Sequence, residues 1–358
     1  MALPIEPPLA PMLARLQADL PLGEGWLYEP KWDGFRAIVF REGERLRLVS
    51  RNGQPLERYF PELIEALRQA TPVRCVLDGE IVIETSAGLD FDALLQRIHP
   101  AASRVRKLSV ETPASFVAFD LLAVEERSLL EKPFSERRRL LERVLEGGPR
   151  VYLTAQTSDP EIARRWYEQL EGAGIEGVVA KRAGQVYVPG ERVMVKVKHE
   201  RTADCVIGGY RPAAKGGGVG SILLGLYDAQ GELVYVGFAS AFSAPQRREI
   251  LERLRPFEGR AGFAEGKGPG GPSRWNRGHK LGFVSVAPRL VCEVKLDKLQ
   301  GERFRHAAQF QRWRPDKEPR ECTYEQLSLP RGGRRPMPLA TPGAEETRGL
   351  EAIDEKAR

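Results

Sequence analysis

The chain has 358 residues, of which 42% are hydrophobic and 29% charged, and its formal net charge is +6. This length fits two domains with separate cores, and the composition is ordinary for a globular protein. No apolar run reaches the ~18 residues of a membrane span, and the N-terminal MALPIEPPLAPMLARLQ lacks the regions of a signal peptide. We therefore expect a cytoplasmic protein without membrane segments, whose mild positive charge suits a polyanionic partner.

The first part of the chain, from Trp26 to about His199, alternates strand-like and helix-like patterns. Apolar runs on either side of the REGE turn predict a hairpin, and apolar residues at helical spacing after Pro61 predict a helix. The expected elements are the hairpin over 35–50, a helix over 61–70, a strand pair over 73–84, a short helix over 91–98 and a buried strand over 114–124.

Two further helices carry end signals. SERRRLLERVLEGG, 135–148, begins with a candidate N-cap serine and ends in glycines. DPEIARRWYEQLEGAG, 159–174, offers Asp159 as the cap and Pro160 at the first helical position. The segments EGVVAKR and RVMVKVKH then predict two strands that close this region.

After residue 204 the pattern changes to short alternating strands separated by glycine-rich turns, with one helix over 244–257. This mixture predicts a small β-barrel of the OB kind. The hinge between the two parts is expected in KHERTAD, 198–204, and the Pro- and Gly-rich end is expected to be a disordered tail. The fold class is thus α+β, with domains over 1–200 and 201–328 and a tail over 329–358.

The stretch EPKWDGFRA, 29–37, crowds Lys31 between acids and an arginine. A lysine is nucleophilic only as the free amine, and carboxylates such as Glu29 and Asp33 disfavour that form. The arrangement makes chemical sense if a divalent metal or a cationic cluster joins the site with the substrate. An isolated lysine of this kind is usually a solvated surface residue, so the interpretation depends on the rest of the chain.

Seven segments in order carry a resemblance: KWDGFR, SRNG, DGEIVI, FVAFDLL, EGVVAK, VKVK and RPDK. Together they resemble the covalent nucleotidyltransferases, and specifically the ATP-dependent DNA ligases. PPLAPMLA, QRIHP and FRHAAQFQRWRPDK are further similar to the small bacterial ligases related to the ligase module of non-homologous end joining. The chain departs from these relatives at Val179, where methionine is frequent.

The resemblance implies an adenylation domain followed by an OB-fold domain, and a role for each matching residue. Lys31 would be the adenylated lysine, and Glu80 and Glu176 would hold Mg²⁺ or Mn²⁺, which take carboxylates together with phosphate oxygens. Phe119 would stack on adenine with Val179 beneath the purine. The other implied ATP contacts are Glu29, Arg36, Arg51, Lys196, Lys198, Arg314 and Lys317, with Asp316 in the last motif.

Several of these residues also fit plainer interpretations. Phe119 could be ordinary core of a buried strand, and Glu80 could be an exposed acid after a DG turn. Lys196 and Lys198, two residues apart on one strand, could face solvent instead of pyrophosphate. Glu29 could bind the adenine amino group or pair with Arg36.

Other polar features are given no catalytic role. The four histidines and four cysteines show no metal-ligand spacing. KGGGVG, 215–220, lacks the ending of a phosphate-binding loop, and SRWNRGHK, 273–280, is either a nucleic-acid-contacting loop or plain surface. Both are expected to be barrel loops.

The expected activity is sealing of 5′-phosphate and 3′-hydroxyl breaks in duplex DNA through lysyl-AMP and DNA-adenylate, in DNA repair. The alternatives are an RNA ligase, a GTP-using capping enzyme, or a DNA-binding protein that keeps the fold without activity. Nicked or broken duplex DNA is the expected partner of a monomer, and the resemblance adds Ku and a primase-polymerase as candidate partners.

Overall fold

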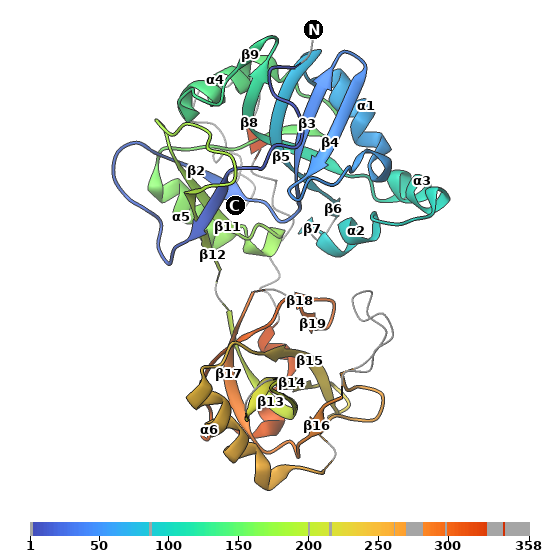
Figure 1. Ribbon diagram of the computed structural model, residues 1–358, viewed down its shortest axis with the longest axis vertical. Coiled ribbons are helices and arrows are strands. Elements are labelled where there is room, and N and C mark those ends of the chain that lie inside the picture. The colour runs from blue at the N-terminus through green and yellow to red at the C-terminus, as the bar shows by residue number, and fades with distance from the viewer. Residues whose placement is uncertain are drawn as a thin grey trace, which may run out of the picture. The chain divides into compact units, whose positions relative to one another are not determined.

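The computed structural model describes residues 3–85, 88–199, 201–214, 217–260, 262–269, 282–297, 299–327 and 339–340. The chain divides into two compact units, Met1–His199 with Pro330–Arg358 and Glu200–Leu329 (Figure 1). The tail expected over 329–358, apart from Leu339–Ala340, and the SRWNRGHK loop lie outside the described residues, as do the first two residues of KGGGVG. The domain limits and the hinge stay predictions, and β13 of the second unit begins at Arg201.

A mostly antiparallel sheet forms the centre of the first unit. Its strand order is β21-β10-β8-β5-β3-β4, with β9 beside β8. The 35–50 hairpin is confirmed as β3 and β4, which pair from Ala37 with Ser50 to Glu42 with Arg45. The strands are β3 (Phe35–Glu42), β4 (Arg45–Ser50), β5 (Arg74–Val82), β8 (Ser115–Val124), β9 (Arg127–Ser128), β10 (Val151–Thr154) and β21 (Leu339–Ala340).

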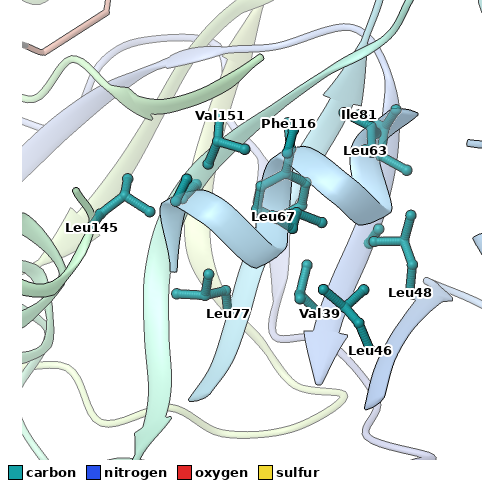
Figure 2. Close-up of a cluster of buried hydrophobic side chains, with 14 of the residues drawn as sticks. Val39, Leu46, Leu48, Leu63, Leu67, Leu77, Ile81, Phe116, Leu145 and Val151 are labelled. Atoms are coloured by element: carbon teal, nitrogen blue, oxygen red, sulfur yellow. The ribbon is translucent and has the colours of Figure 1, made fainter. Parts of the chain in front are cut away.

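Helix α1 (Pro61–Ala70) covers one face of this sheet. Figure 2 shows Leu67 of α1 beside Phe116 of β8, within a cluster of buried apolar side chains. Leu63, Leu67 and Phe116 are each completely buried, which is worth roughly 1.5–3 kcal/mol per large side chain. The apolar spacing that predicts α1 therefore gives the sheet its main cover.

The predicted strand pair over 73–84 is wrong, because β5 is a single strand of nine residues. The DG pair that suggested a turn lies inside it, with a register shift against β8 between Asp78 and Gly79. A Cβ at Gly79 would lie 2.3 Å from the Phe116 ring. Gly79 is thus required by close packing inside the sheet, so Glu80 does not follow a hairpin turn.

The other helices of the unit begin and end as follows: α2 (Phe91–Gln96), α3 (Ala102–Glu111), α4 (Phe134–Val144) and α5 (Pro160–Gln169). The Asp159 cap of α5 is confirmed, since its carboxylate accepts from the Glu161 N–H at 2.8 Å. The Ser135 cap of α4 is wrong: the N-cap is Pro133, without a side-chain hydrogen bond. Helix α3 was not predicted.

A second, four-stranded sheet of the first unit has the order β1-β12-β11-β2. Its strands are β1 (Leu13–Leu16), β2 (Trp26–Lys31), β11 (Gly177–Arg182) and β12 (Arg192–Lys198), and a small pair β6 (Glu84–Thr85) and β7 (Gly88–Leu89) stands apart. Apolar side chains of β2, β11 and β12 pack with Ala163 and Trp166 of α5 in a separate cluster. This sheet carries Lys31, and it joins segments far apart in sequence.

The second unit is built on the antiparallel path β15-β14-β13-β17-β20, with β16 beside β13. A parallel bridge between Ala239, at the end of β15, and Ala308, just before β20, brings the two edges of the path together. Its elements are β13 (Arg201–Pro212), β14 (Val219–Tyr227), β15 (Leu233–Ala239), α6 (Ala244–Leu254), β16 (Val284–Ser285), β17 (Val291–Leu296), β18 (Leu299–Gln300), β19 (Arg303–Phe304) and β20 (Gln309–Trp313).

Five strands closing around a core with one helix are consistent with the expected OB-fold, and the α+β class is confirmed. Short 3-10 helices occupy Glu57–Tyr59, Glu171–Ala173, Arg255–Phe257, Pro319–Glu321 and Tyr324–Leu327. Over the part of the chain that is described, no helix is both long and apolar enough to cross a bilayer.

Candidate active site

The register of β2, β11 and β12 places Lys31 beside residues from the far end of the unit. Lys31 pairs across β2 and β11 with Gly177, which pairs on its other side with Lys198 of β12. Two residues along, Glu29 pairs with Val179 and Val179 with Lys196. Since residues two apart share a face of a strand, the two rows bring five of the predicted site residues, Glu29, Lys31, Val179, Lys196 and Lys198, to neighbouring positions of this sheet.

Lys31, Glu176 and Lys198 form a cluster of charges at the end of these strands. The Lys31 Nζ donates to Glu176 Oε2, and the Lys198 Nζ lies 3.2 Å from the same oxygen. Burial raises the pKa of the Glu176 carboxyl, but the two ammonium groups outweigh it and hold that pKa well below its usual range. Glu176 is therefore a carboxylate that bridges two lysines.

Lys196 faces a different environment on the same strand. Its side chain lines a pocket with Lys31 and Glu29. Burial lowers the pKa of Lys196, and the positive charges of Lys198 and Lys31 lower it further. The structure therefore places the two lysines of VKVK at the site, one on the pocket wall and one on Glu176.

This pocket gathers most of the predicted nucleotide contacts. Its walls come from β1, β2, β3, β8, β11 and β12 together with the turn after β4 and the end of β5. The predicted residues that line it are Glu29, Lys31, Arg36, Arg51, Glu80, Phe119, Val179 and Lys196. Glu176 and Lys198 contact Lys31 or its partner directly.

Glu80 lies at the end of β5, half-buried and close to both Lys31 and Glu176. Burial raises its pKa to about 8, the positive charges of Lys31 and Arg36 oppose that rise, and Glu176 and Asp78 add to it. The mutual influence of Glu80 and Glu176 shows that these two acids, 96 positions apart in the sequence (176 minus 80), share one electrostatic environment. The interpretation of Glu80 as an exposed acid is thereby excluded.

Arg36 is fixed by a buried network and does not pair with Glu29. Its Nε donates to Asp78 Oδ1 at 2.9 Å and its Nη2 to Oδ2 at 2.6 Å, while the Tyr187 hydroxyl donates to Oδ2 at 2.7 Å. Burial opposes the charge of Arg36, but Asp78 raises the pKa of the guanidinium above its ordinary value. The suggested Glu29–Arg36 pair is therefore wrong.

Phe119 is the half-buried residue of an otherwise buried strand, β8. The Arg36 guanidinium lies 5.2 Å and the Lys181 Nζ 4.7 Å from the centre of its ring. Because its ring also lines the pocket, Phe119 is available as a stacking surface. Arg51 reaches the same pocket from the SRNG turn, where its N–H donates to the Arg36 carbonyl at 3.1 Å.

Glu80 and Glu176 are the side chains that suit a divalent ion. Across the described residues, no three His, Cys, Asp or Glu side chains gather in a group that could hold a metal by themselves. A pair of carboxylates fits Mg²⁺, since this ion takes one or two carboxylates and completes its octahedron with phosphate oxygens and water. The donor set therefore fits a metal that arrives with a nucleotide.

The RPDK segment lies on the second unit, following β20. The Arg314 Nη1 donates to both oxygens of Asp204, at 2.8 and 2.9 Å, and its Nη2 lies 2.8 Å from Asp316 Oδ2. The hydrogen bond from Arg314 lowers the pKa of Asp316 to about 2. Lys317 lies 3.6 Å from Glu321, so Arg314 and Lys317 are described within their own unit.

The sequence reasoning missed several residues that line the pocket: Leu13, Ala14, Pro30, Trp32, Lys181, Arg192 and Met194. Lys181 belongs to the EGVVAK segment and lies two positions after Val179, which places it on the same face of β11. That period was the available signal for Lys181. Leu13 and Ala14 offered none, because β1 reaches the site only through its pairing with β12.

Family models match both units of this chain. Residues 7–198 match the ATP dependent DNA ligase domain, and residues 215–317 match the ATP dependent DNA ligase C terminal region. The chain belongs to the ATP-dependent DNA ligases. The resemblance predicted from seven short segments is thus confirmed over most of the chain.

Named relatives agree with this assignment. DNA ligase C1 of Mycolicibacterium smegmatis is 49% identical over 340 residues, which are 92% of this ligase and 97% of the relative. The multifunctional non-homologous end joining protein LigD of Mycobacterium bovis is 32% identical over 325 residues, 88% of this ligase and 40% of that longer protein. A solved structure from a study of Lig E DNA ligases shares the fold, with a TM-score of 0.52 and 19% identity over 85% of this ligase and 99% of that chain.

Proposed function

We propose that this ATP-dependent DNA ligase seals breaks through a covalent AMP on Lys31. The observation that carries the proposal is the convergence of Lys31, Glu176 and Lys198 at the end of three paired strands, beside a pocket lined by Glu80 and Phe119. A nucleophilic lysine needs partners that remove and replace its charge, and the sequence separation of these groups makes chance association a poor explanation.

In the first step the Lys31 Nζ attacks the α-phosphorus of ATP, and the bond to the β-phosphate oxygen breaks so that pyrophosphate leaves. The ion pair with Glu176 must open before this attack. Lys196 and Lys198 would balance the charge of the departing pyrophosphate. Mg²⁺ or Mn²⁺ held by Glu80 and Glu176 would withdraw charge from the α-phosphate.

In the second step a 5′-phosphate oxygen of DNA attacks the AMP phosphorus and breaks its bond to Lys31. In the third step the 3′-hydroxyl attacks the DNA 5′-phosphate and AMP leaves. Phe119 and Val179 would hold the adenine between them, Glu29 its amino group, and Arg36 and Arg51 the sugar and phosphate. Arg314 and Lys317 are proposed contacts of the triphosphate in the first step.

The biological setting is also part of the proposal. Similarity to an end-joining protein favours a role in DNA repair, and Ku and a primase-polymerase are proposed partners. We further propose a monomer that acts in the cytoplasm on nicked or broken duplex DNA, with domains over 1–200 and 201–328.

The experiment that tests the mechanism is labelling of the protein with α-labelled ATP, followed by sealing of nicked DNA. Wild type should acquire label with Mg²⁺ or Mn²⁺ and release it to a nick, whereas Lys31→Ala should acquire none. Lys107→Ala is the matched control, because Lys107 is 69% exposed. Label on the Lys31→Ala variant would exclude the mechanism, and GTP or nicked RNA as the better substrate would favour the rival activities.

A further inference from the structure

Glu29 is held by side chains that the proposed mechanism does not use. The Lys181 Nζ lies 2.6 Å from Glu29 Oε2, and the Gln156 Nε2 donates to Oε1 at 3.0 Å. Glu29 is 3% exposed and Lys181 2% exposed, yet both border the pocket. Gln156 does not border it, so it acts on a ligand only through Glu29.

The Glu29 carboxylate keeps acceptor capacity for a ligand. An ionised carboxylate has about four acceptor sites, and Lys181 and Gln156 each take one. Arg138 lies 3.7 Å from Oε1, too far for a hydrogen bond, and its Nη1 has no hydrogen-bond partner among the described residues. The two contacts therefore fix the direction of the carboxylate while sites toward the pocket remain open.

Lys181 also contacts the aromatic wall of the pocket. Its ammonium lies 4.7 Å from the centre of the Phe119 ring and 4.4 Å from that of Phe134, both within cation–π range. One buried side chain thus touches the proposed base platform, Phe119, and the acceptor at its edge, Glu29. A planar base stacked on Phe119 would present its rim to Glu29.

We infer that Lys181 and Gln156 form a positioning clamp for Glu29 that selects a purine with an amino group at position 6. A fixed carboxylate accepts from the 6-amino group of adenine. The 6-oxo group of guanine is itself an acceptor and would face that carboxylate without a proton between them. The inference rests on the proposed nucleotide site, and it assigns the clamp residues no contact with ATP.

The test compares two nucleotides that differ only at the group in question, ATP and purine riboside triphosphate, which lacks the 6-amino group. The readout is kcat/KM for labelling of Lys31. Wild type should prefer ATP by roughly tenfold to a hundredfold, the worth of a hydrogen bond to a charged acceptor. In Lys181→Met and Gln156→Leu this preference should fall several-fold, and Lys181→Arg should retain more of it than Lys181→Met.

Two controls separate the clamp from general damage. Lys107→Met and Gln69→Leu replace the same residue types at exposed positions and should keep the wild-type preference. Sealing of a nick that already carries a 5′-adenylate needs no ATP, so every variant should retain it. If Lys181→Met loses this sealing as well, its fold is damaged, and the Gln156→Leu comparison decides.

An unchanged preference for ATP in Gln156→Leu and Lys181→Met, even with slower labelling of both nucleotides, would overturn the clamp. So would a wild type that labels equally well with both nucleotides. Failure of wild type to label with either one contradicts the proposed function itself, so the two ideas fail in different ways.

Discussion

The main-chain N–H of Glu176 donates to the main-chain carbonyl of Lys31 at 2.8 Å. The backbone thus holds the two residues side by side, and their side chains form an ion pair on the same spot. Lys31 ends β2, and Glu176 immediately precedes β11. The position of the nucleophile relative to its carboxylate is therefore set by strand pairing rather than by loop conformation.

Replacing Glu176 with Gln should slow lysine adenylation by roughly tenfold to a thousandfold, because it removes an electrostatic group at the reacting atoms. The measurement is the rate of labelling with α-labelled ATP over a range of Mg²⁺ concentrations, where the variant should need more metal. Glu168→Gln, at an exposed position of α5, is the control. A wild-type rate and metal dependence in Glu176→Gln would remove Glu176 from the site.

Replacing Gly177 with Ala should destabilise the first unit by about 2 kcal/mol or more. Gly177 has φ of +145°, and a Cβ there would lie 2.0 Å from the Val197 carbonyl oxygen of β12, so both backbone strain and overlap oppose a side chain. Gly184→Ala is the matched control, because nothing lies within 4 Å of its Cβ position. Urea unfolding should separate the two variants; equal midpoints would contradict the close approach.

Local signals in the sequence were enough for the hairpin β3–β4, for α1 and for the cap of α5, because each depends on residues close together in the chain. The partners of Glu29 could not be predicted in this way. Lys181 and Gln156 reach it only through the pairing of distant strands and the segment after β10. Gly79 was misassigned for the same reason, since its need for a small residue comes from Phe116.

The acid near Lys31 should make stability depend on pH. Burial raises the pKa of Glu80 to about 8 in the folded chain, so between about pH 4.5 and 8 the folded state keeps a proton that the unfolded state releases. Stability from this group is thus complete below pH 4.5 and is lost as the pH rises through 8. Glu80→Gln should melt like wild type near pH 4.5 and increasingly higher toward pH 8.

Melting temperatures of the two proteins, measured with EDTA from pH 4.5 to 9, check this expectation. Glu84→Gln provides the control, because Glu84 is exposed on β6 and should show no such trend. A constant difference between Glu80→Gln and wild type across the range would contradict the raised pKa.

In the second unit, Asp204 should affect the chemistry through Arg314. The guanidinium of Arg314 is held by both oxygens of Asp204, and the main chain of Asp204 is itself tied to Gln326 by hydrogen bonds of 2.8 and 3.0 Å. Asp204→Asn keeps one acceptor but removes the charge, so Arg314 should lose its fixed orientation. If Arg314 contacts the triphosphate, adenylation of Lys31 should slow several-fold, while sealing of a nick that already carries AMP should change little. Glu293→Gln, which releases the exposed Arg312 on the same sheet, should leave both rates unchanged. An equal loss in both reactions would show that Asp204 supports the fold of the unit, and normal adenylation in Asp204→Asn would show that the pair is dispensable for the first step.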